Sequence, residues 1–122
     1  MKEQRKWTLI ATEQFKSWLS KQDEECRIAV LTSLNNLRFY GPQLSRPYAD
    51  TVKGSKYANM KELRVQHQGK PIRAFFAFDP LRQAIVLCAG DKSGDKQFYN
   101  RMIRLADNEF TAYLATLEKK DD

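Results

Sequence analysis

The pattern of apolar and polar positions at the start of the chain predicts a short strand followed by two helices. Residues 6–11 (KWTLIA) have the composition of a strand. Thr12 and Asp23 each stand just before a run in which apolar side chains recur three and four residues apart, and both are favourable N-caps. Gly41 and Pro42 should end the second helix, because glycine adopts the left-handed conformation readily and proline cannot continue a helix. Two helices with so short a link should form an antiparallel hairpin that packs on a sheet.

Three strand-like runs follow in the middle of the chain, at residues 61–67, 72–78 and 84–89. Apolar and polar side chains alternate along the first run, which predicts one face in the core and one open face. The third run is apolar on both faces, as in a central strand that is covered on both sides. Short turns at residues 68–71 and 79–80 should make neighbouring strands antiparallel.

The last part of the chain has a helical pattern, with apolar side chains every three or four residues from Phe98 to Leu117. This stripe is typical of core packing rather than of a binding groove. The opposite face of the predicted helix carries Lys96, Asn100 and Arg104. We therefore expect one α+β domain over residues 1–122, with two N-terminal helices packed on a small antiparallel sheet and a C-terminal helix.

Composition and charge narrow the possible functions. The 122 residues carry a net charge of +6, and the isoelectric point is near 9.4. A basic surface favours nucleic acid or another acidic partner. No apolar run approaches the roughly 20 residues of a membrane span, and the N-terminus lacks the pattern of a secretory signal, so we expect a cytoplasmic protein that does not contact a membrane.

The residues that usually carry metal or nucleophile chemistry are scarce. Cys26 and Cys88 lie in apolar surroundings, which favours two buried thiols over a disulfide. His67 is the sole histidine, so neither a zinc site nor a two-histidine ribonuclease mechanism is expected. There is also no glycine-rich phosphate loop and no carboxylate cluster suited to magnesium. We expect no metal and no cofactor.

Basic residues recur along the predicted sheet, which suggests a platform for a polyanion. Arg64 and Arg73 lie within strands, and Lys92 follows the last strand. Cleavage of RNA without a metal needs a base for the 2′-hydroxyl, a cation for the phosphate oxygens and an acid for the leaving oxygen. Arginine suits the phosphate, whereas lysine acts as a base only where burial or neighbouring cations lower its pKa. The connection 43–58 is either a solvated loop or a basic edge of this platform that reaches a backbone phosphate. Its cations, with one residue just beyond it, are Arg46, Lys53, Lys56 and Lys61.

The run GPQLSRPYADTVKGSKYANMKELRV resembles a segment of the RelE/HigB toxin superfamily, and PIRAFFAFDP and AIVLCAGDKSG resemble its later sheet motifs. The resemblance is to the phage-type, Gp49-like HigB branch and extends from the first strand to about Ala106. It implies a RelE/ParE-like fold and a type II toxin that cleaves mRNA in the ribosomal A site. It also implies a cognate antitoxin, expected to be a small helix-turn-helix protein, through which alone the toxin would reach operator DNA.

The resemblance also assigns site residues by motif position. Arg64 and Arg73 would bind the phosphate in the transition state, unless they only form surface ion pairs with Glu62 or Asp79. Tyr99 would stack on the substrate or relay a proton. The remaining candidates are Lys61, Lys92 and Lys96 as base, acid or phosphate contacts, with Lys53, Lys56 and His67 in RNA binding; His67 is alternatively an exposed turn residue.

Other functions stay open at this point. Members of the superfamily often have a catalytic tyrosine or histidine near a short C-terminus, whereas this chain continues into a long helix, which leaves the acid unassigned. ParE-like members poison DNA gyrase without cutting RNA. A third alternative is a non-toxic member that acts only with its partner in autoregulation.

Overall fold

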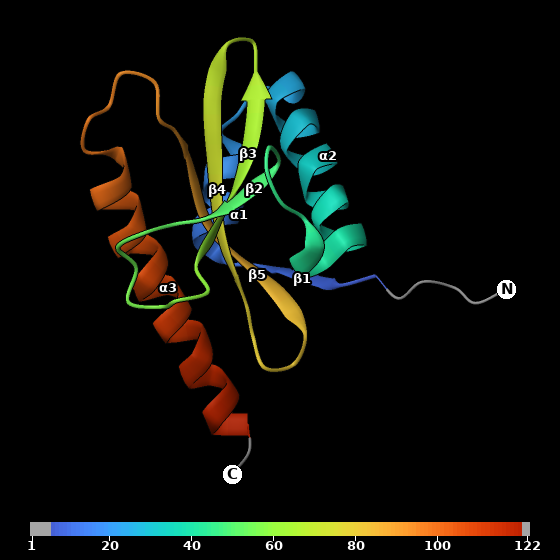
Figure 1. The fold of residues 1–122 in the computed structure, drawn as a ribbon, viewed down its shortest axis with the longest axis vertical. Helices are drawn as coiled ribbons and strands as arrows, with labels where there is room; N and C mark the ends of the chain where they lie inside the picture. Colours follow the sequence, from blue (N-terminus) through green and yellow to red (C-terminus); the bar gives the residue numbers. More distant parts are fainter. Residues whose placement is uncertain (1–5, 121–122) are drawn as a thin grey trace, which may run out of the picture.

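A five-stranded sheet with the strand order β1-β5-β4-β3-β2 forms the middle layer of the protein (Figure 1). The structure is a computed structural model and describes residues 6–120. Strands β3, β4 and β5 are neighbouring antiparallel strands, which confirms the predicted core of the sheet. The strands are β1 (Thr8–Ala11), β2 (Ala49–Thr51), β3 (Lys61–His67), β4 (Lys70–Phe78) and β5 (Gln83–Asp91).

The helices begin and end where local sequence signals predict. The Thr12 side chain accepts a hydrogen bond from the Phe15 amide, and the Asp23 side chain accepts one from the Cys26 amide. Gly41 has a φ of +57° and caps the second helix, as predicted. The helices are α1 (Glu13–Ser20), α2 (Glu24–Tyr40) and α3 (Phe98–Lys120), and a short 3-10 helix, η1 (Gly41–Gln43), follows α2. None of the helices in the described region is long and apolar enough to cross a membrane.

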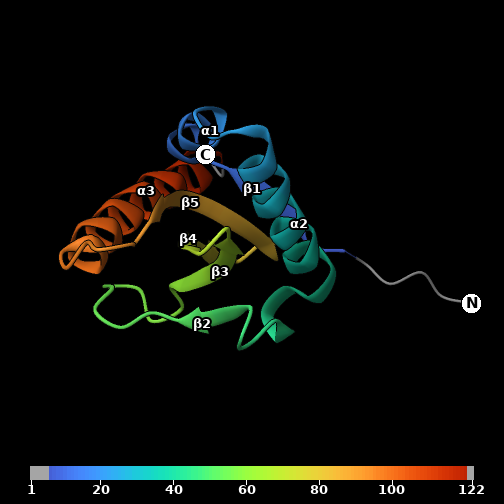
Figure 2. The ribbon, with the colours of Figure 1, turned by 90° about the horizontal axis from the view of Figure 1, so that it is seen from above.

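Helices cover both faces of the sheet, and Figure 2 shows α2 and α3 on opposite sides of it. Side chains from α1 and α2 form one core layer with the sheet, and side chains from α3 form the other. Strand β5 contributes to both layers and is buried from Ala84 to Ala89, which confirms the prediction of a central, covered strand. Helix α3 packs mainly on β5 and β4. The part of that face formed by β3 and β2 is therefore available for polar side chains.

Two features of the sheet differ from the prediction. Strand β1 pairs in parallel with β5, so the sheet is mixed rather than wholly antiparallel. Residues Ala49–Thr51, expected within a connecting loop, form β2, which pairs antiparallel with the start of β3. Neither feature has a local cause. The pairing of β1 depends on β5, which is distant in the sequence. Strand β2 is only three residues long and includes an aspartate, a poor strand former. Pairing with β3 stabilises it.

Candidate functional site

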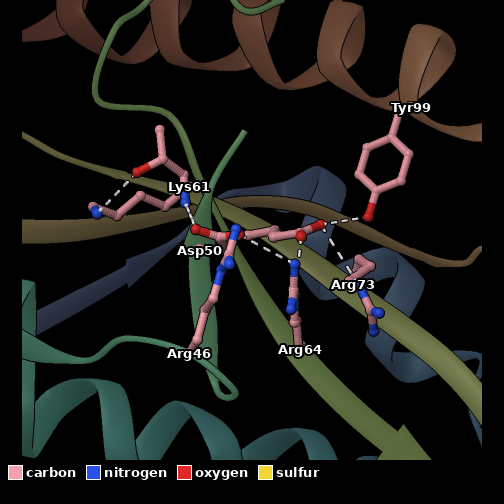
Figure 3. A network of polar contacts seen from close by, with 8 residues as sticks. Arg46, Asp50, Lys61, Arg64, Arg73 and Tyr99 are labelled. Carbon is pink, nitrogen blue, oxygen red and sulfur yellow. Dashed lines mark hydrogen bonds and ion pairs between the residues drawn. The ribbon is translucent and has the colours of Figure 1, made fainter. Parts of the chain in front are cut away.

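A buried carboxylate is the centre of a polar network on the face of the sheet that α3 leaves open. Glu62 on β3 is 3% exposed and accepts hydrogen bonds from Arg64 Nε at 3.1 Å and from the Tyr99 hydroxyl at 2.7 Å. Arg73 Nε lies 3.6 Å from the same carboxylate, an ion-pair distance that is too long for a hydrogen bond. Figure 3 shows Arg64 and Tyr99 pointing toward one place from β3 and α3, with Arg73 of β4 beside them. Nη1 of Arg73 is turned back to its own strand, where it donates to the Ile72 carbonyl at 3.1 Å.

Strand geometry explains how these side chains meet. Glu62 and Arg64 are two residues apart on β3, so both point to the same face. Arg73 on β4 is the direct cross-strand partner of Arg64. Two cations at opposed positions repel one another, and Glu62 between them offsets that repulsion.

A second carboxylate extends the network toward the edge of the sheet. Asp50 on β2 accepts a hydrogen bond from Arg64 Nη2 at 3.2 Å and another from Arg46 Nε at 2.9 Å. The bond from Arg46 is the main cause that holds the pKa of Asp50 below its usual value, and the charge of Arg64 adds a smaller effect in the same direction. On the same strand, Thr51 Oγ1 lies 3.5 Å from Lys61 Nζ. The contacts of Asp50 and Glu62 form one chain from Arg46 to Tyr99.

Positive charge is in excess in this network, and the two strand arginines are covered to different degrees. The side chain of Arg64 is 33% exposed, whereas that of Arg73 is 11% exposed. Nη1 of Arg64 makes no hydrogen bond or ion pair with any residue in the range 6–120. Arg64 thus keeps a donor for a phosphate oxygen, and Arg73 serves mainly as a buried countercharge for Glu62.

The Tyr99 hydroxyl is fixed as a hydrogen-bond donor. Burial, together with the hydrogen bond and charge of Glu62, raises the pKa of Tyr99, against a smaller opposing effect of Arg73. The phenol therefore keeps its proton at neutral pH and directs it to Glu62. Lys92 Nζ lies 5.5 Å from the centre of the Tyr99 ring, in cation–π contact.

A basic cleft of about 550 Å³ lies between α3 and the residues that follow β2. Asp107 on α3 accepts hydrogen bonds from the Ser55 hydroxyl and from the Lys56 amide, and so holds the wall formed by residues 53–56 against the helix. The residues that line the cleft include Lys53, Lys56, Gln97, Tyr99, Asn100 and Arg104.

The structure brings together most of the candidate residues found in the sequence. Lys53, Lys56 and Tyr99 line the cleft, and Tyr99 joins it to the network around Glu62. Lys96 is exposed in the turn before α3, next to Gln97 of the cleft wall. The candidates that lie in the network or against Tyr99 are Arg64, Arg73 and Lys92. Lys61 contacts Thr51, but it lies on the same face of β3 as Val65, opposite Glu62.

His67 lies apart from the other candidates. It follows Val65 by two residues on β3, and Val65 belongs to the core layer formed with α1 and α2, so His67 lies on the opposite face from Glu62. Its Nε2 atom is buried and has no hydrogen-bond partner within the described part of the chain. A role of His67 in RNA binding stays a prediction that this site does not support.

Sequence reasoning missed the part played by the carboxylates. Glu62 entered only as a partner in a surface ion pair, yet it is buried and shared by Arg64 and Arg73. Asp79, the other expected partner, instead accepts hydrogen bonds from Tyr113 and Gln83. The signal for Glu62 was its position two residues before Arg64 on one strand face. Among residues 6–120, no group of three or more His, Cys, Asp or Glu side chains is placed to hold a metal ion.

Comparisons with known proteins agree on one family. The family model described as phage derived protein Gp49-like matches residues 17–111. The toxin HigB2 of Mycobacterium tuberculosis is 44% identical over 114 residues, which cover 92% of this chain and 56% of that protein. The chain thus spans little more than half the length of that relative. The toxin HigB3 of the same organism is 39% identical over 109 residues, which cover 88% of this chain and 94% of that protein.

Two solved structures share the fold. A mutant of the Escherichia coli toxin RelE in the free state has a TM-score of 0.59 and 11% identity, covering 81% of this chain and 97% of that chain. The toxin–antitoxin complex RelBE2 of Mycobacterium tuberculosis contains a chain with a TM-score of 0.50 and 16% identity, covering 75% and 97%. At such identities the likeness establishes the fold alone, which is the predicted RelE-like α+β fold.

Proposed function

The chain belongs to the phage-derived Gp49-like family of the RelE/HigB toxin superfamily, and from this premise we propose that it is the toxin of a toxin–antitoxin pair and cleaves messenger RNA on the ribosome. The observation that carries the proposal is the meeting of Arg64, Arg73 and Tyr99 on one face of the sheet, beside a basic cleft. A strand of RNA that lies in the cleft would pass directly over the polar network.

Each part of the site has a role in this reaction. Lys53 and Lys56 neutralise backbone phosphates of the RNA along the cleft. The RNA then loses the counterions that were bound to these phosphates, which makes binding dependent on salt. Nη1 of Arg64 donates to an oxygen of the phosphate that is cut, with Arg73 behind it as a source of positive charge.

The bond changes follow from the use of the RNA's own nucleophile. The 2′-hydroxyl loses its proton to a base and attacks the adjacent phosphorus, while the bond to the 5′-oxygen breaks and that oxygen takes a proton from an acid. The products are a 2′,3′-cyclic phosphate and a 5′-hydroxyl. The base and the acid come from Lys92 and Lys96, because the proton of Tyr99 is held by Glu62 and Lys61 lies on the opposite face of β3.

The partners follow from the same proposal. The ribosome presents the message and completes the site, and the setting is the cytoplasm. A small helix-turn-helix antitoxin neutralises the chain and alone connects it to operator DNA. The solved neighbour RelBE2 is a toxin–antitoxin complex, which is consistent with a protein partner of this kind.

The test is to induce the chain in cells without an antitoxin and to map the 5′ ends of a translated message by primer extension. Wild type should produce new ends and stop growth, and Arg64→Ala should do neither. Arg38→Ala is the matched control, because Arg38 is exposed at the end of α2, away from the site.

Two results would contradict the proposal. DNA breaks without new RNA ends would indicate a ParE-like action on gyrase, for which the long α3 is the structural argument. Unimpaired growth with abundant folded protein would indicate a non-toxic member that acts only with its partner.

A further inference from the structure

Glu62 occupies a position that protein stability alone does not explain. A buried carboxylate loses its hydration, and replacing a buried ion pair by apolar side chains of similar volume is often neutral or stabilising. Glu62 is nevertheless 3% exposed and in contact with three polar side chains from β3, β4 and α3. Two of these contacts, Arg64 and Arg73, are the side chains that supply positive charge to the phosphate in the proposed reaction.

We propose that Glu62 is the positioning residue of this site: it holds Arg64, Arg73 and Tyr99 in the arrangement that receives the phosphate, and it stays in place when RNA binds. The inference rests on the proposed function, because it concerns the same site. It assigns no contact between Glu62 and RNA.

The way in which Arg64 is held supports this role. Glu62 accepts a hydrogen bond from Nε of the guanidinium and Asp50 accepts one from Nη2, which leaves Nη1 without a partner among the described residues. A planar guanidinium held at two of its three nitrogens has a fixed orientation. The remaining nitrogen then points in one direction before the substrate arrives, so little ordering is needed when the phosphate binds.

Glu62 also makes it possible for the two arginines to be neighbours. Arg64 and Arg73 are directly opposed across β3 and β4, where like charges destabilise the pair. With the carboxylate between them, two cations can lie side by side and a single phosphate can be near both. Without it, their mutual repulsion would turn at least one of them away from the site.

The rival explanation is that Glu62 is an internal competitor that fills the phosphate position until RNA displaces it. The burial of Glu62 argues against this. A displaced carboxylate would have to leave Arg64, Arg73 and Tyr99 together, and its 3% exposure gives it little contact with solvent. The two explanations predict opposite effects of removing the charge.

The test compares wild type with Glu62→Gln, which keeps the size of the side chain, in single-turnover cleavage of a ribosome-bound message. We expect the maximal rate to fall about 10- to 100-fold, as for other residues that orient a site from behind. The protein concentration that gives half of the maximal rate should stay equal or fall, because the loss of a negative charge strengthens the attraction of the protein to phosphates. A faster rate would favour the competitor, and an unchanged rate would leave Glu62 a purely structural residue; either would overturn the proposal.

Asp79→Asn is the matched control. Asp79 is also a buried carboxylate that accepts a hydrogen bond from a tyrosine of α3, but its partners are Tyr113 and Gln83. This variant should lose stability and keep the wild-type cleavage rate below its unfolding temperature. A loss of rate equal to that of Glu62→Gln would show that any buried carboxylate has this effect, and would overturn the specific role.

A measurement on the unaltered protein keeps the test valid if Glu62→Gln does not fold. The Nε–H signal of Arg64 can be followed by nuclear magnetic resonance while a 2′-deoxy oligonucleotide, which cannot be cleaved, is added. We expect this proton to stay protected from exchange with water, because Glu62 keeps it; loss of protection on binding would overturn the proposal. If wild type cuts no message at all, the proposed function fails, while the resonance experiment still reports whether Glu62 holds Arg64.

Discussion

Replacing Arg73 by alanine should destabilise the protein far more than replacing Arg64, although the two residues are cross-strand neighbours. The side chains of Arg73 and Glu62 are 11% and 5% exposed, so their ion pair belongs to the buried class. Removing one partner of such a pair costs about 3–5 kcal/mol, because the other charge stays buried without compensation. Glu62 keeps Arg64 and Tyr99 in this case, which places the cost near 3 kcal/mol. Arg64 is 33% exposed; of its two partners, Asp50 is 24% exposed and Glu62 keeps Arg73 and Tyr99, so the corresponding loss is about 1 kcal/mol.

The assay is thermal unfolding followed by circular dichroism at neutral pH. For a chain of this length, 1 kcal/mol corresponds to roughly 4 °C in Tm, so we expect a fall of about 12 °C for Arg73→Ala and about 4 °C for Arg64→Ala. Both variants should remain folded at 25 °C if the protein has the usual stability of about 5–15 kcal/mol. A loss of toxicity in Arg73→Ala can therefore be assigned to catalysis only when the Tm of the variant shows that the protein is still folded under the conditions of the toxicity assay.

Arg73→Lys separates charge from volume. It restores a cation near Glu62 and should recover more than half of the lost Tm. Equal Tm values for Arg73→Ala and wild type would refute the reasoning, because they would mean that Glu62 does not need this countercharge. An equal fall for the alanine and lysine variants would show that packing, and not charge, makes Arg73 important.

Three further predictions concern other parts of the fold. Gly41→Ala should cost about 2–4 kcal/mol in a denaturant titration, because a Cβ there would lie 2.2 Å from the Trp7 indole nitrogen at a φ of +57°, and unchanged stability would contradict this. Cys88 should not react with a thiol reagent at pH 8 until the protein is unfolded, since burial raises its pKa to about 12; rapid reaction of the native protein would be contrary to the structure. Burial works to raise the pKa of Asp79, but its hydrogen bonds, the largest from Tyr113, hold it below the usual value. Asp79 therefore contributes stability above pH ~4 that is lost as the pH falls through its folded pKa, and Asp79→Asn should flatten the stability curve in that acid range.

Local signals in the sequence were sufficient for most elements of the fold. Thr12 and Asp23 are N-caps because their side chains bond to amides three residues on, a contact that depends on neighbours in the chain alone. Gly41 ends α2 for an equally local reason. The run of residues 84–89, apolar on both faces, predicted a strand covered on both sides, which the two core layers confirm.

The missing features all depend on distant pairing. Nothing within residues 49–51 marks a strand, and β2 exists because β3 lies beside it. The parallel pairing of β1 with β5 could not be read from either run alone. The sequence likewise predicted that Arg64 and Arg73 belong to the site, but it did not predict how far each is buried. Their burial depends on the register of β3 against β4 and on Tyr99 from α3.

The position of β5 between β1 and β4 has a consequence for how the chain reaches its native state. The Thr12 hydroxyl donates to the Leu87 carbonyl across 75 positions of sequence, and β1 has β5 as its sheet neighbour. A nascent chain therefore cannot close the sheet until β5 has been synthesised, and such high contact order slows folding. Tyr99 emerges later still. If the ribosome is the target of this protein, the ribosome that makes it is spared until the residues around Tyr99 have been synthesised.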